Sequence, residues 1–436
     1  MLYDAVGNMT GSYDAVGRLT SYAYDIANRR TATREAASTP LARVTTTLYD
    51  AVGNVTGTKS PAVDASGVRL TSFSYDALNR RTSVTEAAHL PLPNPARRTT
   101  ATFYDPVGNV AFVIDPDGNL TNYLYDALNR QTVTIDPLQK RTTVLYDAVG
   151  NVTQITDRNQ HVRQFLYDAL NRRTNEVWQT NPLTTFTYNY DAASQLINAN
   201  DAVSSYTYTP DALGRTTIST FAGPLGSVIR LDQSYNAADE RTGLAATIGT
   251  VADFRTSYLY DAVSRMTYLY QAGQGGNGVA PKLVQLGYNP DSQFSSIGRY
   301  ADAGATQPLV TTTYDFYDAL GRLTQMTHQL ATTLVRYTWQ LDVGDRLTQS
   351  GSTGDGTTTY GDDSDDEDTS VSYTDSQPNE SYNYDGNGNR TSANGTNYSP
   401  PDRGNHLTSD GVYSYTYDPE GNRFTRVRGS DLTTYQ

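Results

Sequence analysis

The sequence predicts an all-β protein in which tandem β-hairpins form one long, curled antiparallel sheet. Tyrosine dominates the aromatic residues, with 34 copies against 10 phenylalanines and 2 tryptophans. The pair Tyr-Asp recurs along most of the chain, and glycine or asparagine follows most pairs three residues after the aspartate. Aromatic residues combined with regularly spaced turn residues favour short strands joined by tight turns.

The Tyr-Asp pairs define a repeat. From Tyr104 through Tyr125 and Tyr146 to Tyr167 the spacing is 21 residues each time, and neighbouring intervals of 23, 25, 26 and 29 residues fit insertions in loops. A fixed period of this size indicates a repeat architecture. The 15 pairs begin at Tyr3, Tyr13, Tyr24, Tyr49, Tyr75, Tyr104, Tyr125, Tyr146, Tyr167, Tyr190, Tyr260, Tyr314, Tyr317, Tyr384 and Tyr417.

Each part of the unit has a structural interpretation. Phe165 and Tyr167 lie two residues apart, so their rings share one face of a strand and are predicted to build a cross-strand aromatic ladder. Asp168 can accept hydrogen bonds from the backbone N–H groups two residues on, and Asn171 tolerates a positive φ, so together they close a turn. We therefore predict a structural role for the pairs of the most regular units. These residues are Tyr104, Asp105, Tyr125, Asp126, Tyr146, Asp147, Tyr167 and Asp168.

A second turn lies between successive Tyr-Asp pairs, as in the segments that begin at Asp115, Asp136 and Asp157. A 21-residue unit is thus two strands and two turns, and turns ending Val-Gly-Asn alternate with turns ending Leu-Asn-Arg. With strands roughly 4.8 Å apart, about twenty such units would make a flat sheet near 190 Å wide, more than a twisted open sheet sustains. The sheet must therefore curl into a spiral wall that encloses space.

Other interpretations of the repeated residues are weaker. Paired carboxylates can hydrolyse glycosides, but catalysis needs one unusual pair, whereas these aspartates recur in equal settings. Arginine-rich turns such as Asn28-Arg29-Arg30 place cations beside the aspartates and tyrosines, which favours ion pairing and stacking between neighbouring hairpins over binding of an anion. Tyrosine-rich strands also suit sugar stacking, so a carbohydrate-binding module or adhesin stays open as an alternative function.

The run Tyr-Asp-Ala-x-Gly-Arg/Asn-Leu/Val-Thr, clear at residues 13–20, 146–153 and 317–324, resembles the RHS or YD-repeat family. The resemblance covers almost the whole chain. It implies a large hollow β-shell that in many bacterial members encloses a C-terminal toxin. It also implies an extracellular or cell-surface location, a structural role without enzymatic activity, and a partner polypeptide that this chain does not contain.

Members of that family carry a core segment with an Asp-Pro-x-Gly-Leu type motif that is linked to self-cleavage. The nearest strings here, residues 115–120 and 418–423, stand at ordinary repeat positions, and Asp-Pro-x-Gly is itself turn chemistry. We interpret both as turns. Because the chain begins and ends inside repeat units, we expect it to be a piece of a longer protein.

Composition excludes several classes of function. The formal net charge of −13 argues against binding of nucleic acid, which needs clustered lysine and arginine. There is no cysteine for a disulfide or a thiolate metal site, and the four histidines (His89, His161, His328 and His406) stand in no catalytic motif. No stretch approaches the ~20 apolar residues of a membrane span, and no signal peptide is evident. We expect no cofactor.

The acidic run at residues 361–368 is the one candidate metal site. Carboxylates suit a hard cation such as calcium, but the run lacks the ordered alternation of an EF-hand, so a solvated loop is favoured. The candidate ligands are Asp362, Asp363, Asp365, Asp366 and Asp368. The same composition shift suggests a division into a repeat array over residues 1–350, an acidic polar loop or insertion over residues 351–380, and further repeats over residues 381–436.

Overall fold

The computed structural model describes residues 1–13, 17, 19–35, 37, 43–61, 68–88, 90, 97–179, 184–224, 226–275, 278–342, 345–402, 405–418 and 421–435. All regular structure within these residues is β-strand. The 38 strands are β1 (Leu2–Tyr3), β2 (Met9–Tyr13), β3 (Leu19–Tyr24), β4 (Arg30–Glu35), β5 (Arg43–Tyr49), β6 (Val55–Pro61), β7 (Val68–Tyr75), β8 (Arg81–Thr85), β9 (Thr99–Tyr104), β10 (Val110–Ile114), β11 (Leu120–Tyr125), β12 (Gln131–Ile135), β13 (Arg141–Tyr146), β14 (Val152–Thr156), β15 (Val162–Tyr167), β16 (Arg173–Trp178), β17 (Thr184–Tyr190), β18 (Leu196–Asn200), β19 (Ser205–Pro210), β20 (Thr216–Ala222), β21 (Ile229–Tyr235), β22 (Arg241–Ile248), β23 (Val251–Tyr260), β24 (Met266–Gly273), β25 (Lys282–Tyr288), β26 (Phe294–Tyr300), β27 (Pro308–Tyr317), β28 (Leu323–Gln329), β29 (Thr333–Leu341), β30 (Leu347–Ser352), β31 (Gly356–Asp362), β32 (Asp368–Tyr373), β33 (Glu380–Tyr384), β34 (Arg390–Ala393), β35 (Thr396–Asn397), β36 (Ser414–Tyr417), β37 (Arg423–Arg428) and β38 (Asp431–Thr434).

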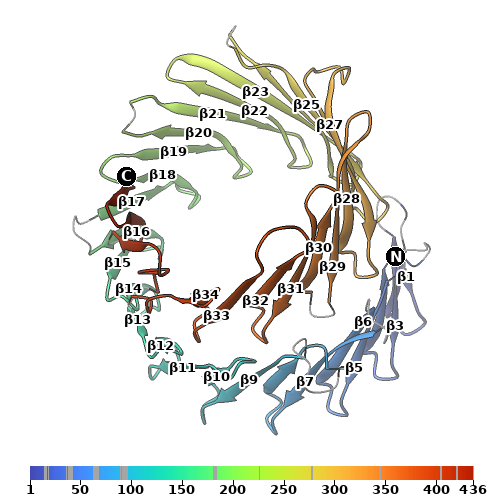
Figure 1. Cartoon of the computed structure of the whole chain (residues 1–436), viewed down its shortest axis with the longest axis vertical. Helices are drawn as coiled ribbons and strands as arrows, with labels where there is room; N and C mark the ends of the chain where they lie inside the picture. The colour runs from blue at the N-terminus through green and yellow to red at the C-terminus, as the bar shows by residue number, and fades with distance from the viewer. Residues whose placement is uncertain are drawn as a thin grey trace.

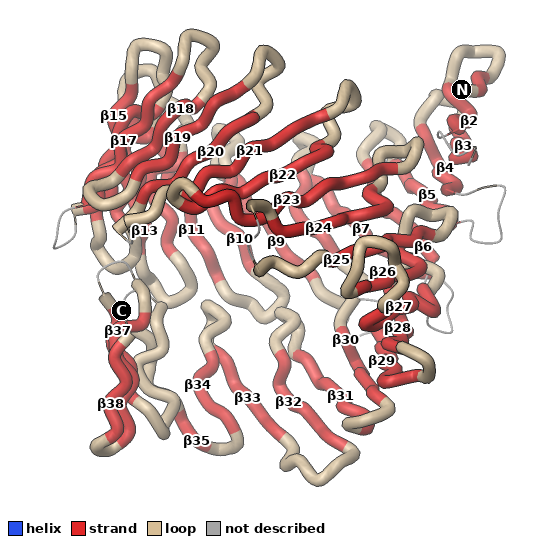
Figure 2. The backbone as a smooth tube through the Cα atoms, turned by 90° about the horizontal axis from the view of Figure 1, so that it is seen from above, coloured by secondary structure: helices blue, strands red, loops and turns tan. Residues whose placement is uncertain are grey.

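Strands β1 to β35 form one sheet, and β36 to β38 form a second, three-stranded sheet. Within each sheet every strand pairs antiparallel with the next one along the chain, as β11 does with β10 and β12. The large sheet winds into a ring (Figure 1), and its later strands come to lie beside its earlier ones. Figure 2 shows β31 to β35 displaced along the axis of the ring from β9 to β13, so the sheet is a coil of more than one revolution. The predicted curled antiparallel sheet is confirmed.

The coil is a wall one sheet thick. The protein exposes 24601 Å², whereas a compact protein of this mass exposes about 16,000 Å². Among the described residues the buried apolar side chains are few: Ala87, Phe165, Ala246, Tyr258, Leu283 and Val371. The fold therefore depends on backbone ladders, turns and contacts between neighbouring hairpins more than on a central core.

A β-bulge at nearly every turn of the Tyr-Asp type explains the curl. Leu124 pairs with Val133 and Tyr125 pairs with Gln131, so Thr132 is left without a partner in the ladder. The Thr132 hydroxyl instead donates to the Leu124 carbonyl (3.3 Å). Bulges bend a strand and increase its twist, and a bulge at the same point of each unit accumulates into a coil. The repeated threonine after the turn is a structural residue that the sequence interpretation missed, although its recurrence was visible.

The segment 351–380 differs from its sequence interpretation. It contains the whole of β31 and β32, and both pair antiparallel with their neighbours in the main sheet. The expectation of a polar loop is corrected here, because threonine, serine and tyrosine supply strand residues between the acidic turns. The proposed division into three regions stays a prediction.

Candidate functional site

The turns that follow the odd-numbered strands from β1 to β33 lie on one edge of the coiled sheet, here called the Tyr-Asp rim because most of them begin with a Tyr-Asp pair. The turns that follow the even-numbered strands form the opposite edge, the second-turn rim. In the turn after β11, the Asp126 Oδ1 atom accepts the backbone N–H groups of Leu128 (2.9 Å) and Arg130 (3.0 Å). Asn129 has a φ of 60°, the left-handed conformation that asparagine tolerates. The aspartate thus closes the turn from within, as its position in the repeat predicts.

The tyrosine of each pair is anchored by its hydroxyl group. Tyr125 donates to the Val110 carbonyl (3.0 Å), Tyr146 to the Gln131 carbonyl (2.8 Å), and Tyr167 to the Val152 carbonyl (2.9 Å). Each accepting residue lies at the start of a strand in the preceding hairpin, so every phenol ring ties one hairpin to the one before it. Phe165 is buried on the same face as Tyr167, as the two-residue spacing predicts.

Arginine links a turn to the next turn along the rim. Arg130 makes a two-pronged contact with Asp126, with Nε and Nη2 each 2.7 Å from Oδ2, while its Nη1 donates to the Asp147 carbonyl (2.8 Å). Its guanidinium also lies 4.7 Å from the centre of the Tyr146 ring, a cation–π geometry. The Arg130 backbone N–H and guanidinium hold the pKa of Asp126 below its usual range. Equivalent stacks join Arg29 to Tyr49, Arg80 to Tyr104, Arg172 to Tyr190, Arg215 to Tyr235 and Arg265 to Tyr288.

Asparagine makes the alternate link. Asn109 Nδ2 donates both to Asp105 in its own turn (3.0 Å) and to the Asn129 side-chain carbonyl in the next turn (2.9 Å). Asn151 does the same with Asp147 (2.9 Å) and Asn171 (3.0 Å). An Asn link therefore alternates with an Arg link, which gives the two alternating turn sequences a physical reason. From Asn8 to Asp191 the Tyr-Asp rim is a continuous chain of hydrogen bonds.

These contacts bear on the carbohydrate-binding alternative. A sugar stacks on an exposed aromatic face, but the repeat tyrosines are partly buried, carry arginine guanidinium groups over their rings and use their hydroxyls on backbone carbonyls. The rings of the repeat tyrosines therefore make contacts within the wall, and they do not support carbohydrate binding.

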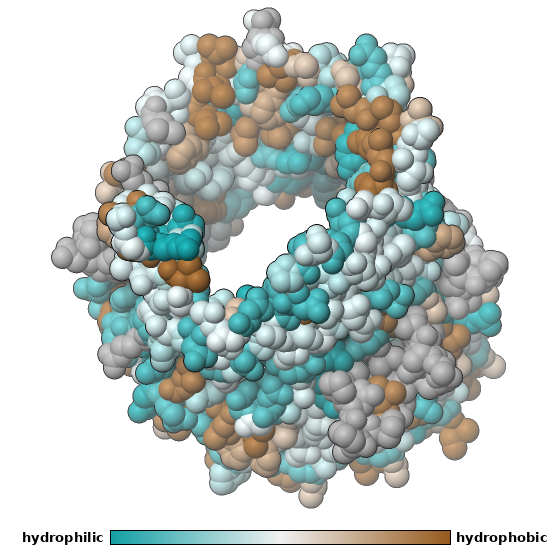
Figure 3. All heavy atoms as spheres, viewed as in Figure 1, coloured by the Kyte–Doolittle hydropathy of each residue, from teal (hydrophilic) through white to brown (hydrophobic). Residues whose placement is uncertain are grey.

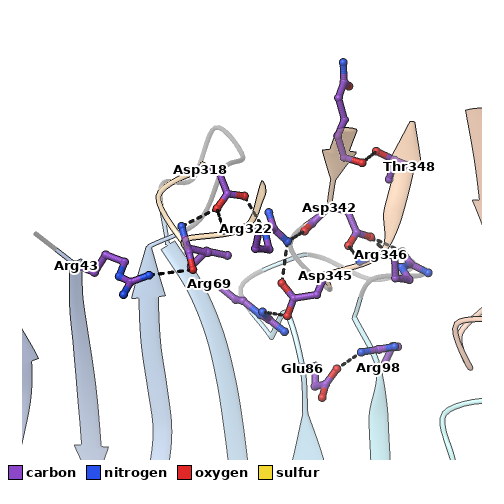
Figure 4. Close-up of polar contacts among 12 residues, drawn as sticks. Arg43, Arg69, Glu86, Arg98, Asp318, Arg322, Asp342, Asp345, Arg346 and Thr348 are labelled. Carbon is purple, nitrogen blue, oxygen red and sulfur yellow. Dashed lines mark hydrogen bonds and ion pairs between the residues drawn. The ribbon is translucent and has the colours of Figure 1, made fainter. Parts of the chain in front are cut away.

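The second winding of the coil rests on the first, and we call this contact the seam (Figure 4). The Tyr-Asp rim of the second winding meets the second-turn rim of the first. Arg69 forms an ion pair with Asp345, Arg98 forms one with Asp366, and Arg43 Nη1 donates to the Leu320 carbonyl (3.3 Å). Farther along, Asn387 Nδ2 donates to Asp136 (3.3 Å). These partners lie about 250 to 277 residues apart, so one revolution takes that length of chain.

The carboxylates of the seam depart from the repeat consensus. Asp345 and Asp366 occupy the left-handed turn position, with φ of 68° and 67°, where the regular units have glycine or asparagine. Aspartate tolerates this conformation, and at both places an arginine of the first winding meets it. Arg98 is 13% exposed and also contacts Glu86. The residues that form the seam therefore replace the consensus residues of the repeat at specific turns.

One stretch of the seam brings like charges together. Asp117 and Asn119, in the turn before β11, face the turn between β31 and β32, and the two sides border a recess of roughly 270 Å³. Asn119 Nδ2 donates to Asp365 (3.4 Å). Burial, with the charges of Asp115, Asp117 and Asp363, raises the pKa of Asp365 to about 6. Burial and the nearby Asp363, Asp365 and Asp117 raise the pKa of Glu367 to about 7.

The five calcium candidates lie in this region but have separate roles. Asp363 accepts the backbone N–H groups of Asp365 and Glu367 (3.0 Å each) and so closes the turn. Asp366 pairs with Arg98. Asp362 and Asp368 are register partners at the ends of β31 and β32. Among the described residues, no group of three acidic, histidine or cysteine residues is placed to hold a metal ion.

The acidic stretch predicts a pH dependence. Because the folded protein holds protons on Asp365 and Glu367 more tightly than an unfolded chain does, stability from these groups is greatest below about pH 4 and falls as pH rises through 6 and 7. We expect D365N/E367Q to match the parent protein near pH 4.5 and to exceed it at pH 8, with a melting temperature higher by about 1–2 °C, a modest gain because solvent screens both groups. Thermal unfolding of both proteins across this range checks it. An equal difference at both ends would contradict the assignment.

The remaining sequence candidates are turn or strand residues. Asp115 accepts the Asn119 backbone N–H (2.7 Å) in an ordinary second turn, as expected, whereas part of the segment 418–423 and His89 lie outside the described residues. His161 lies 3.4 Å from Asp157, and His406 lies 3.0 Å from Asp402. No helix in the described part of the chain is long and apolar enough to cross a membrane.

Together these contacts define a class of protein, a hollow wall of tandem β-hairpins whose recurring residues hold the backbone. The RHS Repeat family profile matches residues 3–40, 49–89, 104–141 and 146–177. These segments are RHS repeats, as the Tyr-Asp motif indicated. A comparison with curated protein sequences gives no match.

Solved structures share the fold. The crystal structure of TcdB2-TccC3-Cdc42 has a TM-score of 0.70 at 14% identity, over 99% of this chain and 26% of that one. The crystal structure of TcdB2-TccC3-TEV gives 0.66 at 13%, over 96% and 27%. The Photorhabdus luminescens Tc holotoxin pore gives 0.61 at 13%, over 95% and 24%. At such identities the likeness concerns the fold, and this chain spans about a quarter of the length of those chains.

Proposed function

We propose that this coil is a segment of a shell that encloses or presents a polypeptide belonging to a longer parent protein. The observation that carries the proposal is the central opening, which persists when all heavy atoms are drawn and is bordered mainly by hydrophilic side chains (Figure 3). A polar lumen suits a chain that must be held without being trapped by apolar contacts.

Two further features support this role. The seam joins successive windings by ion pairs and hydrogen bonds, so the wall is closed between coils along that stretch. The repeated Tyr, Asp, Arg and Asn side chains are used to hold the wall itself. The wall is therefore built as a container. Since one solved neighbour is a holotoxin pore, a toxin-type cargo and an extracellular site of action fit best.

Protease protection in the complete parent protein tests the proposal. We expect sites in the enclosed segment to resist a small protease in the parent protein and to be cut at least ten times faster in R69A/R98A, which loses the two seam ion pairs of Arg69 and Arg98. The matched control is Arg230→Ala, which breaks an exposed pair with Asp232 away from the seam. A lumen found empty by electron microscopy, or equal cleavage in all three proteins, would refute enclosure.

A further inference from the structure

Two rims of the coil take no part in the seam. They are the Tyr-Asp rim over residues 4–215 and the second-turn rim over residues 201–432. In the seam, the same two kinds of rim meet each other. The uncovered rims therefore have the shapes that pack together elsewhere in this molecule.

The Tyr-Asp rim of the first winding carries a row of exposed apolar tips. Each tip stands two residues after the turn aspartate and is 65–74% exposed. The row consists of Val6, Val52, Leu78, Val107, Leu128, Val149, Leu170 and Leu213. Where the first winding covers the Tyr-Asp rim of the second, the same position holds Leu320, Asp365 and Asn387, all partly buried. The rim is thus more apolar where it is uncovered than where it is covered.

The second-turn rim shows the same contrast. Its uncovered part exposes Val203 (67%), Val251 (61%), Leu330 (48%), Leu334 (60%) and Val412 (51%). Its covered part, in the first winding, has the polar turns 115–119 and 157–161. Figure 3 shows apolar side chains gathered over the stretch from β21 to β28. Extended apolar rows of this kind mark interaction surfaces.

We propose that the two apolar rims dock on each other between copies of this chain, so that a second copy stacks along the coil axis and continues the spiral. Successive turns on a rim are two strands apart, roughly 10 Å, on both partners, so the two rows of turns match in pitch. The contact repeats the geometry of the seam but replaces its ion pairs with apolar side chains. Because the two surfaces differ, the association is head-to-tail and does not close after two copies.

Sedimentation velocity of residues 1–436 between about 1 and 100 µM tests the proposal. We expect species larger than a dimer to grow with concentration. V107D/V149D should block the Tyr-Asp rim, and V203D/L330D should block the second-turn rim, so each variant alone should be a monomer. Aspartate already stands at the tip position as Asp365, so the turn accepts it. The control is Leu145→Asp, which adds a charge at a 51% exposed strand residue away from both rims and should leave assembly unchanged.

Mixing the two blocked variants distinguishes this docking from nonspecific association. Each variant keeps one intact rim, and the two intact rims are complementary, so an equimolar mixture should give dimers and stop there. A wild-type chain that stays monomeric at 100 µM, or a mixture that stays monomeric while the wild type assembles, would overturn the proposal. Assembly that survives in both blocked variants would overturn it as well.

Discussion

Asp126→Ala is expected to open the hairpin of β11 and β12, with amide exchange there faster by about ten- to a hundredfold. The change removes the acceptor of two backbone N–H groups and leaves Arg130 without its carboxylate. The effect should reach the next turn, because Arg130 also holds the Asp147 carbonyl and stacks on Tyr146. Hydrogen exchange read by mass spectrometry over residues 120–151 measures both effects.

The chain offers its own control for this prediction. Where the turn begins with Asn289 in place of aspartate, its Oδ1 still accepts two backbone N–H groups (3.0 Å each), and its Nδ2 donates to Gln293 (2.8 Å). Gln293 in turn donates to the Gly321 carbonyl (2.8 Å), the task that arginine performs elsewhere. We therefore expect D126N/R130Q to exchange at nearly the parent rate. Protection unchanged in Asp126→Ala would contradict the turn-closing role.

The repeat and its turns could be predicted because they are local. Asp168 and Asn171 stand within one turn, so their residue types and spacing alone specify its geometry. The alternation of Val-Gly-Asn and Leu-Asn-Arg was visible as well. The cause of the alternation is the Asn109 to Asn129 link followed by the Arg130 to Asp147 link. This cause could not be predicted, because it depends on which atoms face each other across adjacent hairpins.

The seam could not be predicted, because it depends on the length of chain in one revolution. Bulge geometry and loop insertions set that length, and neither follows from the repeat period. The signal that did exist was the departure of Asp345 and Asp366 from the consensus turn residue. The interpretation of residues 351–380 as a loop was wrong because the seam partners of the acidic run could not be known from the sequence. Its charges were interpreted as those of a solvated loop, whereas Asp366 is a partner for Arg98 and Asp363 closes a turn.

Removing Arg69 and Arg98 from the seam is expected to separate the second winding from the first. In R69A/R98A the second winding loses the ion pairs of Arg69 and Arg98, and Asp345 and Asp366 keep only Arg322 and Arg346 of their own winding. Arg98 is 13% exposed and Asp366 is 43% exposed, so we place this pair between a surface and a buried one, with a cost of about 2 kcal/mol. Small-angle scattering should show a larger maximum dimension, and amide exchange should rise at residues 345–367.

Charge reversal distinguishes a specific pair from a general loss of positive charge. Arg98→Glu places a third acid beside Glu86 and Asp366 and should open the seam further than alanine does. Adding Asp366→Arg restores an opposite pair across the same contact, so R98E/D366R should recover most of the closed scattering profile. Arginine has no short polar side chain to ease the left-handed turn at 366, so recovery should be incomplete. If R69A/R98A and Arg98→Glu both kept the closed scattering profile, the coil would be held by the curvature of its bulged hairpins and not by the seam.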